Sequence, residues 1–147
     1  MNKEPIVKEV SINAPVSRVW KAITDMNELR KWFFDITDFE PLPDAQFIFN
    51  AGGENKKLDH VCTLKEVEEN KRLSYTLCFN ELPGEESLVS FELFDEGNDV
   101  TRLRLTHSGL EGFTADRVFT KDDFNGGWEL LIKESIKEYI EQGKNQI

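Results

Sequence analysis

Four successive segments between residues 58 and 108 alternate polar and apolar residues, and this pattern constrains the fold most strongly. Such alternation places every second side chain on one face of a β-strand. The predicted strands are residues 58–67, 72–79, 87–94 and 100–108. Residues typical of tight turns separate them, at positions 69–71, Pro83-Gly84 and Gly97-Asn98. The sequence therefore predicts an antiparallel meander of hairpins.

One face of this meander is predicted to be largely apolar. Every second residue of the strands belongs to it: Val61, Thr63, Val67, Leu73, Tyr75, Leu77, Phe79, Val89, Phe91, Leu93, Leu103, Leu105 and His107. Hairpins centred on the turns pair members of this set, namely Val67 with Leu73, Phe79 with Val89, and Leu93 with Leu103. Leu64 is out of phase with the face, which predicts a β-bulge in its strand.

The residues between those positions are predicted to face solvent. They include His60, and the predicted register sets Cys62 opposite Cys78 on the same outer face. Two thiols in such positions lie close enough to be bridged under oxidation. We expect free thiols, and with two cysteines and two histidines we expect no closed metal site.

Apolar residues at helical spacing occur before the meander. After a predicted first strand at residues 6–12, Pro15 suits a helix start, and apolar residues at i, i+3, i+4 and i+7 predict a short helix through Val16, Val19, Trp20 and Ile23. Asp25 begins a second short helix, with Glu28 in capping position and a stripe of Leu29, Trp32 and Phe33. Short strands are predicted around residues 36–39 and 47–50.

The C-terminal part predicts one long helix, capped by Thr120 with Asp123 in capping-box position and ended by Gly143. Its broad apolar stripe comprises Phe124, Trp128, Leu131, Ile132, Ser135, Ile136, Tyr139 and Ile140. Gly126 and Gly127 near its start each cost roughly 1 kcal/mol relative to alanine. Close packing on the sheet, or a thin wall at a pocket entrance, would offset that cost.

At 147 residues the chain has the length of one domain, which we assign to residues 1–147. Its net charge of -10 argues against nucleic acid and anionic membranes as partners. No apolar run approaches the ~20 residues of a membrane span. The N-terminal residues lack the pattern of a secretory signal, so we expect a cytoplasmic protein.

Several fragments together resemble one family: Ile12-Asn13-Ala14-Pro15 with Val19-Trp20, residues 29–32 and 103–109, and Gly127-Trp128. The chain resembles the START-like or polyketide-cyclase (SRPBCC) superfamily. Within it, the chain is similar to the group of the C-terminal domain of the activator of heat-shock-protein-90 ATPase. The resemblance implies an α+β helix-grip fold, in which a curved antiparallel sheet of six to seven strands surrounds a long C-terminal helix and two short helices follow the first strand.

The resemblance also implies a function, because standalone members bind small molecules. A bent sheet facing one helix leaves space that aromatic side chains can line. We therefore expect a small apolar or aromatic molecule to bind there, without catalysis and without a cofactor. The candidate ligand-binding residues are Trp32, Phe47, Phe49, Thr63, Tyr75, Leu77, Phe91, Leu105, His107, Trp128 and Leu131. The plainer interpretation is core packing for the aromatic residues, and for His107 a histidine satisfied at a strand end.

Two other functions stay open. A cyclase or hydrolase would need an acid or base in the cavity, and His107 and Tyr75 are the only candidates that the sequence offers. No motif of a serine hydrolase, zinc protease, phosphate-binding loop or dinucleotide-binding fold occurs, so no catalytic residue is assigned. A chaperone-associated adaptor would use the exposed sheet face or the loops to bind its protein partner.

Overall fold

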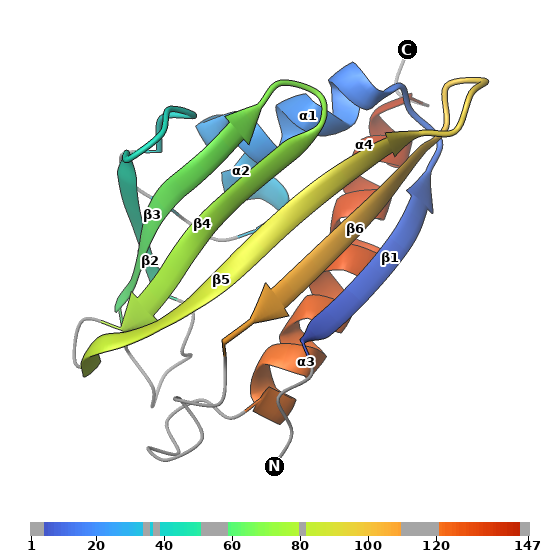
Figure 1. The fold of residues 1–147 in the computed structure, drawn as a ribbon. Helices are drawn as coiled ribbons and strands as arrows, with labels where there is room; N and C mark the ends of the chain where they lie inside the picture. Colours follow the sequence, from blue (N-terminus) through green and yellow to red (C-terminus); the bar gives the residue numbers. More distant parts are fainter. Residues whose placement is uncertain are drawn as a thin grey trace.

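The computed structural model describes residues 5–33, 36, 39–50, 59–79, 82–109 and 121–144. Its elements, in chain order, are β1 (Ile6–Ile12), α1 (Val16–Thr24), α2 (Met26–Trp32), β2 (Gln46–Asn50), β3 (Asp59–Glu68), β4 (Arg72–Phe79), β5 (Leu82–Asp95), β6 (Thr101–Ser108), α3 (Lys121–Leu130), a π-helical turn (Leu131–Ser135) and α4 (Ile136–Lys144). The described residues confirm the predicted α+β class, with a six-stranded antiparallel sheet and two short helices after the first strand (Figure 1).

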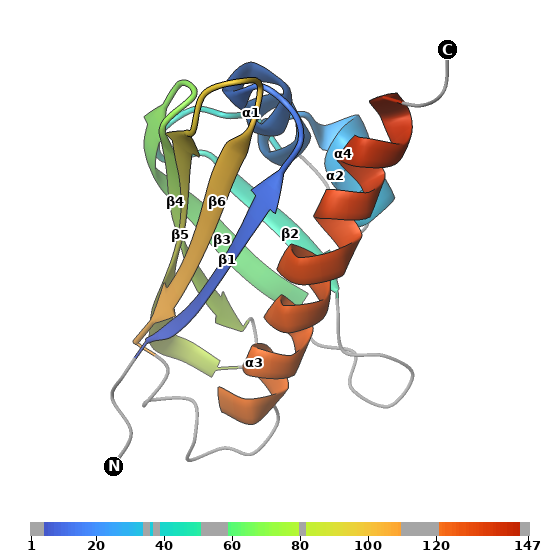
Figure 2. The ribbon, with the colours of Figure 1, turned by 90° about the vertical axis from the view of Figure 1, so that its right-hand side faces the viewer.

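The strands are ordered β1-β6-β5-β4-β3-β2, so β1 and β2 are the two edges of the sheet. The sheet is curved, and Figure 2 shows the C-terminal helix lying across one of its faces, with α1 and α2 beside the α4 end. The buried apolar side chains of the strands and helices form one continuous core. The core therefore lies between the concave face of the sheet and the helices.

The register confirms two of the three predicted pairs and corrects the third. Val67 lies opposite Leu73, and Leu93 lies opposite Leu103, as predicted. Phe79 is opposite Leu82 instead of Val89. The prediction was wrong because β5 already begins at Leu82, so that the proposed turn residues Pro83 and Gly84 lie within a strand.

The predicted bulge in β3 is confirmed, and it reverses the face on which the first half of that strand lies. The pairing shifts between Leu64 and Glu66, so one extra residue enters β3 at this point. An extra residue moves every side chain on one side of the bulge to the opposite face. Cys62 and Leu64 are consequently buried. The assignment of Val61 and Thr63 to the inner face was wrong, since both are only half-buried.

The same reversal corrects the positions of His60 and the cysteines. His60 is buried instead of solvent-facing, and its ring stacks on that of Phe49 with centroids 4.7 Å apart. Cys62 lies opposite Leu77, while Cys78 lies opposite Val61. Because successive residues point to opposite faces, the two thiols lie on different faces of the sheet. The predicted opposition of the two cysteines was therefore wrong, and both are free thiols in the structure.

Polar contacts hold α1 and α2 against the C-terminal helix. Asp25 caps α2 as predicted, accepting from the backbone N–H groups of Asn27 and Glu28. The Glu28 side chain accepts hydrogen bonds from Arg18 Nη1 at 2.7 Å and from the Tyr139 hydroxyl at 3.0 Å. This buried carboxylate thus links α1, α2 and α4.

Of the predicted strand at residues 36–39, the structure describes the two end residues, and neither lies in a strand. Ile36 and Phe39 lie outside any helix or strand, although both are buried. Pro41 and Pro43 follow them, and a proline cannot donate the hydrogen bond that a strand ladder requires. The predicted helix cap at Thr120 lies outside the described residues.

The C-terminal helix buries every fourth residue: Phe124, Trp128, Ile132, Ile136 and Ile140. In an α-helix each such step turns roughly 40° beyond a full turn, so four steps would carry the stripe far around the helix. The π-helical turn Leu131–Ser135 takes up one extra residue and offsets this drift. The whole stripe therefore stays against the curved sheet.

Candidate functional site

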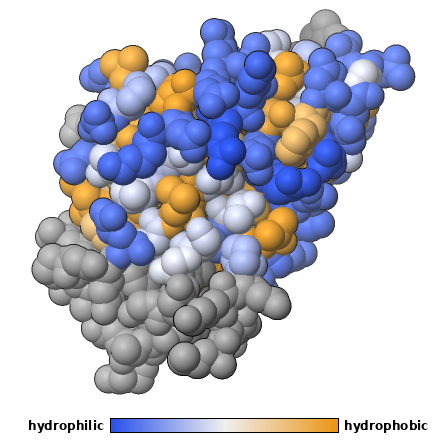
Figure 3. All heavy atoms as spheres, viewed as in Figure 1, coloured by the Kyte–Doolittle hydropathy of each residue, from blue (hydrophilic) through white to orange (hydrophobic). Residues whose placement is uncertain are grey.

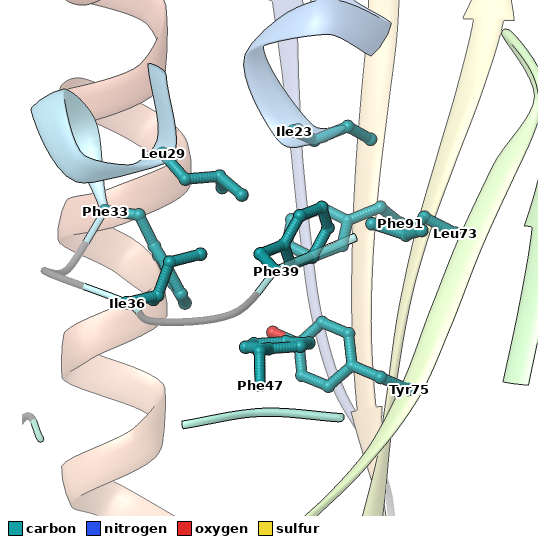
Figure 4. A pocket seen from close by; sticks show the side chains of 9 residues that line it. All are labelled: Ile23, Leu29, Phe33, Ile36, Phe39, Phe47, Leu73, Tyr75 and Phe91. Carbon is teal, nitrogen blue, oxygen red and sulfur yellow. The ribbon is translucent and has the colours of Figure 1, made fainter. Parts of the chain in front are cut away.

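A small pocket lies on the concave side of the sheet, beneath α1 and α2 (Figure 4). Nine side chains line it: Ile23, Leu29, Phe33, Ile36, Phe39, Phe47, Leu73, Tyr75 and Phe91. They come from both short helices, from the segment after α2 and from strands β2, β4 and β5. Residues distant in sequence thus converge on one apolar space.

The free space in this pocket is small. Its cavity volume is about 10 Å³, roughly the least that admits one water molecule. Pockets that enclose a small organic ligand typically measure about 300–1,000 Å³. The lining side chains therefore fill the site in this conformation, and a larger ligand would have to displace some of them.

Aromatic rings in the pocket meet edge to face. The ring of Phe47 lies 5.0 Å from that of Phe39 and 5.1 Å from that of Tyr75, with interplanar angles of 66° and 77°. The Tyr75 ring is in turn 6.3 Å from that of Phe91. Such edge-to-face contacts are the favourable geometry for aromatic pairs, and an aromatic ligand ring can form the same contacts.

One wall of the pocket is formed by residues outside regular secondary structure. Phe33, Ile36 and Phe39 lie between the end of α2 and the start of β2. Phe33 is only half-buried, and its ring reaches those of Phe49 and Trp128 at centroid distances of 5.2 and 6.0 Å. Segments without a hydrogen-bonded ladder open at lower free-energy cost than core strands. No strand ladder holds these three residues, and two hydrogen bonds tie them to α2: the Phe33 N–H donates to Leu29 O at 2.8 Å, and Ile36 O accepts from Arg30 Nε at 3.0 Å.

Tyr75 carries the single polar side-chain atom among the nine lining residues. Its side chain lies on β4 and is buried, and Figure 4 shows the hydroxyl directed toward Phe47 and the pocket. Burial, together with the nearby Cys62 thiol, raises the pKa of the Tyr75 hydroxyl well above its ordinary value. The hydroxyl therefore keeps its proton at neutral pH.

A second buried polar group lies beside the pocket, where β5 and β6 meet α3. The indole N–H of Trp128 donates to His107 Nδ1 at 2.9 Å, and His107 Nε2 is 2.7 Å from the Ser87 hydroxyl. Ser87 lies 3.2 Å from the backbone oxygen of Leu77, to which it donates. An indole nitrogen can only donate, so His107 is the neutral tautomer with its proton on Nε2.

This hydrogen-bonded chain fixes the chemistry available to His107. Burial and the nearby His60 lower the pKa of His107 to about 3. A histidine that donates to Ser87 through Nε2 and accepts from Trp128 through Nδ1 has no free lone pair with which to take a proton. The arrangement holds α3 on the sheet and does not activate Ser87 as a nucleophile.

The predicted ligand-binding residues divide into three groups. Phe47, Tyr75 and Phe91 line the pocket. Buried around it, but not in its lining, are Trp32, Phe49, Leu77, Leu105, His107 and Trp128. Two lie elsewhere, since Leu131 is half-buried in the π-helical turn and Thr63 accepts a hydrogen bond from the exposed Gln46 side chain.

Six lining residues were not among the candidates: Ile23, Leu29, Phe33, Ile36, Phe39 and Leu73. Ile23, Leu29 and Leu73 were predicted to lie on inward faces, so their helical or strand phase could have identified them. Ile36 and Phe39 have no such signal, because they lie outside helices and strands.

The outer face of the sheet presents charged residues in register. Glu9, Arg104, Glu92 and Arg72 lie opposite one another on β1, β6, β5 and β4. Arg104 Nε is 2.6 Å from Glu9, and longer contacts of 3.8 Å join Glu92 to both arginines. Figure 3 shows hydrophilic residues gathered across this face, with hydrophobic ones scattered between them. Exposed pairs of this kind add little stability.

The described part of the chain contains neither a candidate metal site nor a candidate membrane-spanning helix. No cluster of three or more histidine, cysteine or acidic residues there is arranged to hold a metal ion. None of the helices in the described ranges has the length and hydrophobicity needed to cross a bilayer.

Comparison with known families assigns residues 13–141 to the family described as "Activator of Hsp90 ATPase homolog 1-like protein". Comparison with the curated proteins finds no significant match. Solved structures share the fold. MLL2253 from Mesorhizobium loti is 26% identical with a TM-score of 0.71, and the match covers 97% of this chain and 98% of that one.

Two further structures are similar in fold at lower identity. DynU16, a protein in the dynemicin biosynthetic locus, has a TM-score of 0.75 and 24% identity; the match covers 97% of this chain but only 49% of DynU16. The Aha1 dimer from Colwellia psychrerythraea has a TM-score of 0.74 and 23% identity, with 95% and 98% of the two chains covered.

Proposed function

Because the chain belongs to the family of Activator of Hsp90 ATPase homolog 1-like proteins, and its apolar pocket lies between the sheet and the helices, we propose that it binds a small apolar or aromatic molecule there, without catalysis. One observation carries the proposal. Nine buried or half-buried side chains, eight of them purely hydrocarbon, converge on a common space. Binding sites for small organic molecules have this composition, with few polar groups among apolar ones.

Binding requires the pocket to widen. The side formed by Phe33, Ile36 and Phe39 can move without breaking a strand ladder, and the hydrogen bonds that hold it to α2 are those from the Phe33 N–H to Leu29 O and from Arg30 Nε to Ile36 O. The opposite side, formed by Leu73, Tyr75 and Phe91, belongs to the central strands β4 and β5 and stays in place. A ligand thus replaces the contacts of the displaced rings with contacts of its own, and burial of its apolar surface supplies the driving force.

The state of the two polar candidates favours binding over catalysis. A general base must be able to accept a proton near neutral pH. His107 has both ring nitrogens engaged and a pKa lowered to about 3 by burial and by His60. Tyr75 has its pKa raised well above the ordinary value by burial and by the Cys62 thiol, so it stays protonated.

The test is titration of the purified protein with N-phenyl-1-naphthylamine, an uncharged probe whose fluorescence rises in apolar surroundings. We expect saturable binding with one site per chain. Phe39→Ala should strengthen it, because the ring that must be displaced is gone. Phe94→Ala is the matched control, since Phe94 packs under Arg102 at 4.2 Å on the outer face and should leave binding unchanged. No saturable binding by the wild-type protein would contradict the proposal.

The family assignment favours a second candidate, a chaperone-associated adaptor. Addition of the chain to a purified Hsp90-type chaperone would then raise the rate of ATP hydrolysis. A higher ATPase rate together with no probe binding would establish the adaptor in place of the ligand-binding function.

A further inference from the structure

The two glycines near the start of α3 are not explained by packing on the described residues. Gly126 and Gly127 are both exposed, and a Cβ atom on either would meet no atom of the described residues within 4 Å. Glycine is the least favourable residue in a helix interior after proline. The pair therefore weakens this part of the helix, and no contact with the described part of the sheet offsets the loss.

Asn125 precedes this pair and is the only asparagine in the chain that is followed by a glycine. It is exposed, and because α3 begins at Lys121, little more than one helical turn lies before it. Helix ends fray at low free-energy cost, since fraying breaks few hydrogen bonds. The backbone around Asn125 therefore opens more readily than the middle of the C-terminal helix.

An asparagine followed by a glycine can react with its own backbone once the helix has opened. The Gly126 nitrogen loses its proton and bonds to Cγ of Asn125, while the Cγ–Nδ2 bond breaks and Nδ2 leaves with that proton as ammonia. Water then opens the succinimide ring. If the new bond breaks, the product is aspartate; if the original peptide bond breaks, the product is isoaspartate, whose main chain runs through Cβ and Cγ. Glycine favours the attack because no side chain obstructs its nitrogen.

We propose that Asn125 is a site of spontaneous deamidation, and that its isoaspartate product loosens the start of α3. The ring of Phe124 packs on that of His107 with centroids 4.9 Å apart, and the indole N–H of Trp128 donates to the same histidine. Both contacts depend on the regular helical spacing between Phe124 and Trp128. Isoaspartate adds one carbon to the main chain between them, so the two contacts no longer fit together.

The reaction site is separate from the pocket. Figure 2 shows α3 at the end of the C-terminal helix that lies away from α1 and α2, whereas the pocket lies beneath those two helices. Deamidation of Asn125 requires no ligand, and it is independent of the proposed function.

Peptide mass spectrometry of the purified protein, sampled during incubation at pH 8, measures the conversion of each asparagine. We expect Asn125 to convert faster than any other asparagine in the folded protein, but more slowly than in the same protein unfolded in guanidinium chloride. Asn98 is the internal reference, because it lies exposed in a turn but precedes an aspartate. No conversion of Asn125, in a time that converts it in the unfolded chain, would overturn the proposal.

Two variants separate helix opening from the reactivity of the dipeptide. Gly127→Ala keeps Asn125 and Gly126 and places its methyl group in open space, so it strengthens the helix. Its rate of conversion should fall about fivefold in the folded protein, in proportion to the opened population, and should not change in the unfolded chain. Gly126→Ala should nearly abolish conversion in both states. An unchanged rate in folded Gly127→Ala would overturn the role of helix opening.

Thermal unfolding of the products gives a second readout. Asn125→Asp reproduces the aspartate product, and because a negative charge near a helix N-terminus is favourable, its Tm should equal or exceed that of the wild type. The isoaspartate form, separated by chromatography, should have a lower Tm. Equal Tm values for the isoaspartate form and Asn125→Asp would overturn the loosening of α3.

Discussion

Replacement of His107 by glutamine should remove a specific acid sensitivity of the fold. The burial that lowers the pKa of His107 to about 3, from an ordinary value of 6.5, affects only the folded state. Between these two pH values the unfolded chain binds a proton at this residue and the folded chain does not. Acidification therefore favours the unfolded state, and the free energy of unfolding falls as the pH drops from 6.5 toward 3.

The magnitude follows from the difference between the two pKa values. Each pH unit within this window lowers the free energy of unfolding by about 1.4 kcal/mol, which gives about 2 kcal/mol between pH 7 and pH 5. A glutamine in place of His107 keeps one acceptor for Trp128 and one donor for Ser87 but does not titrate in this range. Carboxylates that titrate at the same pH are common to both proteins and cancel in the comparison.

Urea unfolding of the two proteins at pH 7 and pH 5 measures the difference. We expect the wild-type protein to lose about 2 kcal/mol more than His107→Gln on this acidification. Equal losses would refute the reasoning, because they would show that His107 is protonated as readily in the folded state as in the unfolded one.

Three further predictions concern packing and register. Trp128→Ala should lower the free energy of unfolding by about 3–5 kcal/mol, because the side chain is 5% exposed and holds His107; a loss below about 1 kcal/mol in urea unfolding would place it outside the core. A mild oxidant should leave Cys62 and Cys78 as two titratable thiols in the monomer, and loss of both to an internal bridge would contradict the register. Phe91→Trp should cost about 1–3 kcal/mol, since little free space surrounds the ring, and unchanged stability would indicate a larger cavity.

The alternation of residues was sufficient to predict strands β4 and β6, because each keeps one phase along its length. It failed in the first half of β3, where the bulge before Glu66 moves His60 and Cys62 to the inner face. The out-of-phase Leu64 signalled that a bulge exists. Which half of the strand changes face depends on the pairing with β4, and this cannot be read from β3 alone.

Only part of the candidate site was predicted, because residue periodicity identifies inward side chains only within strands and helices. Phe47, Tyr75 and Phe91 lie on strands, where phase identifies the inward residues. Ile36 and Phe39 lie outside helices and strands, so no period predicts their direction. The partners of His107 were also hidden, since Ser87 and Trp128 are 20 and 21 residues away and meet it only in the folded chain.

Methyl NMR of the protein with N-phenyl-1-naphthylamine tests the location of binding directly. If the ligand binds between the sheet and the helices, intermolecular nuclear Overhauser effects should join its ring to the methyl groups of Ile23, Ile36 and Leu73, which line the pocket. Contacts confined to the exposed methyl groups of Val7 and Leu130, 50% and 57% exposed, would place the probe on the surface and contradict a ligand-binding pocket.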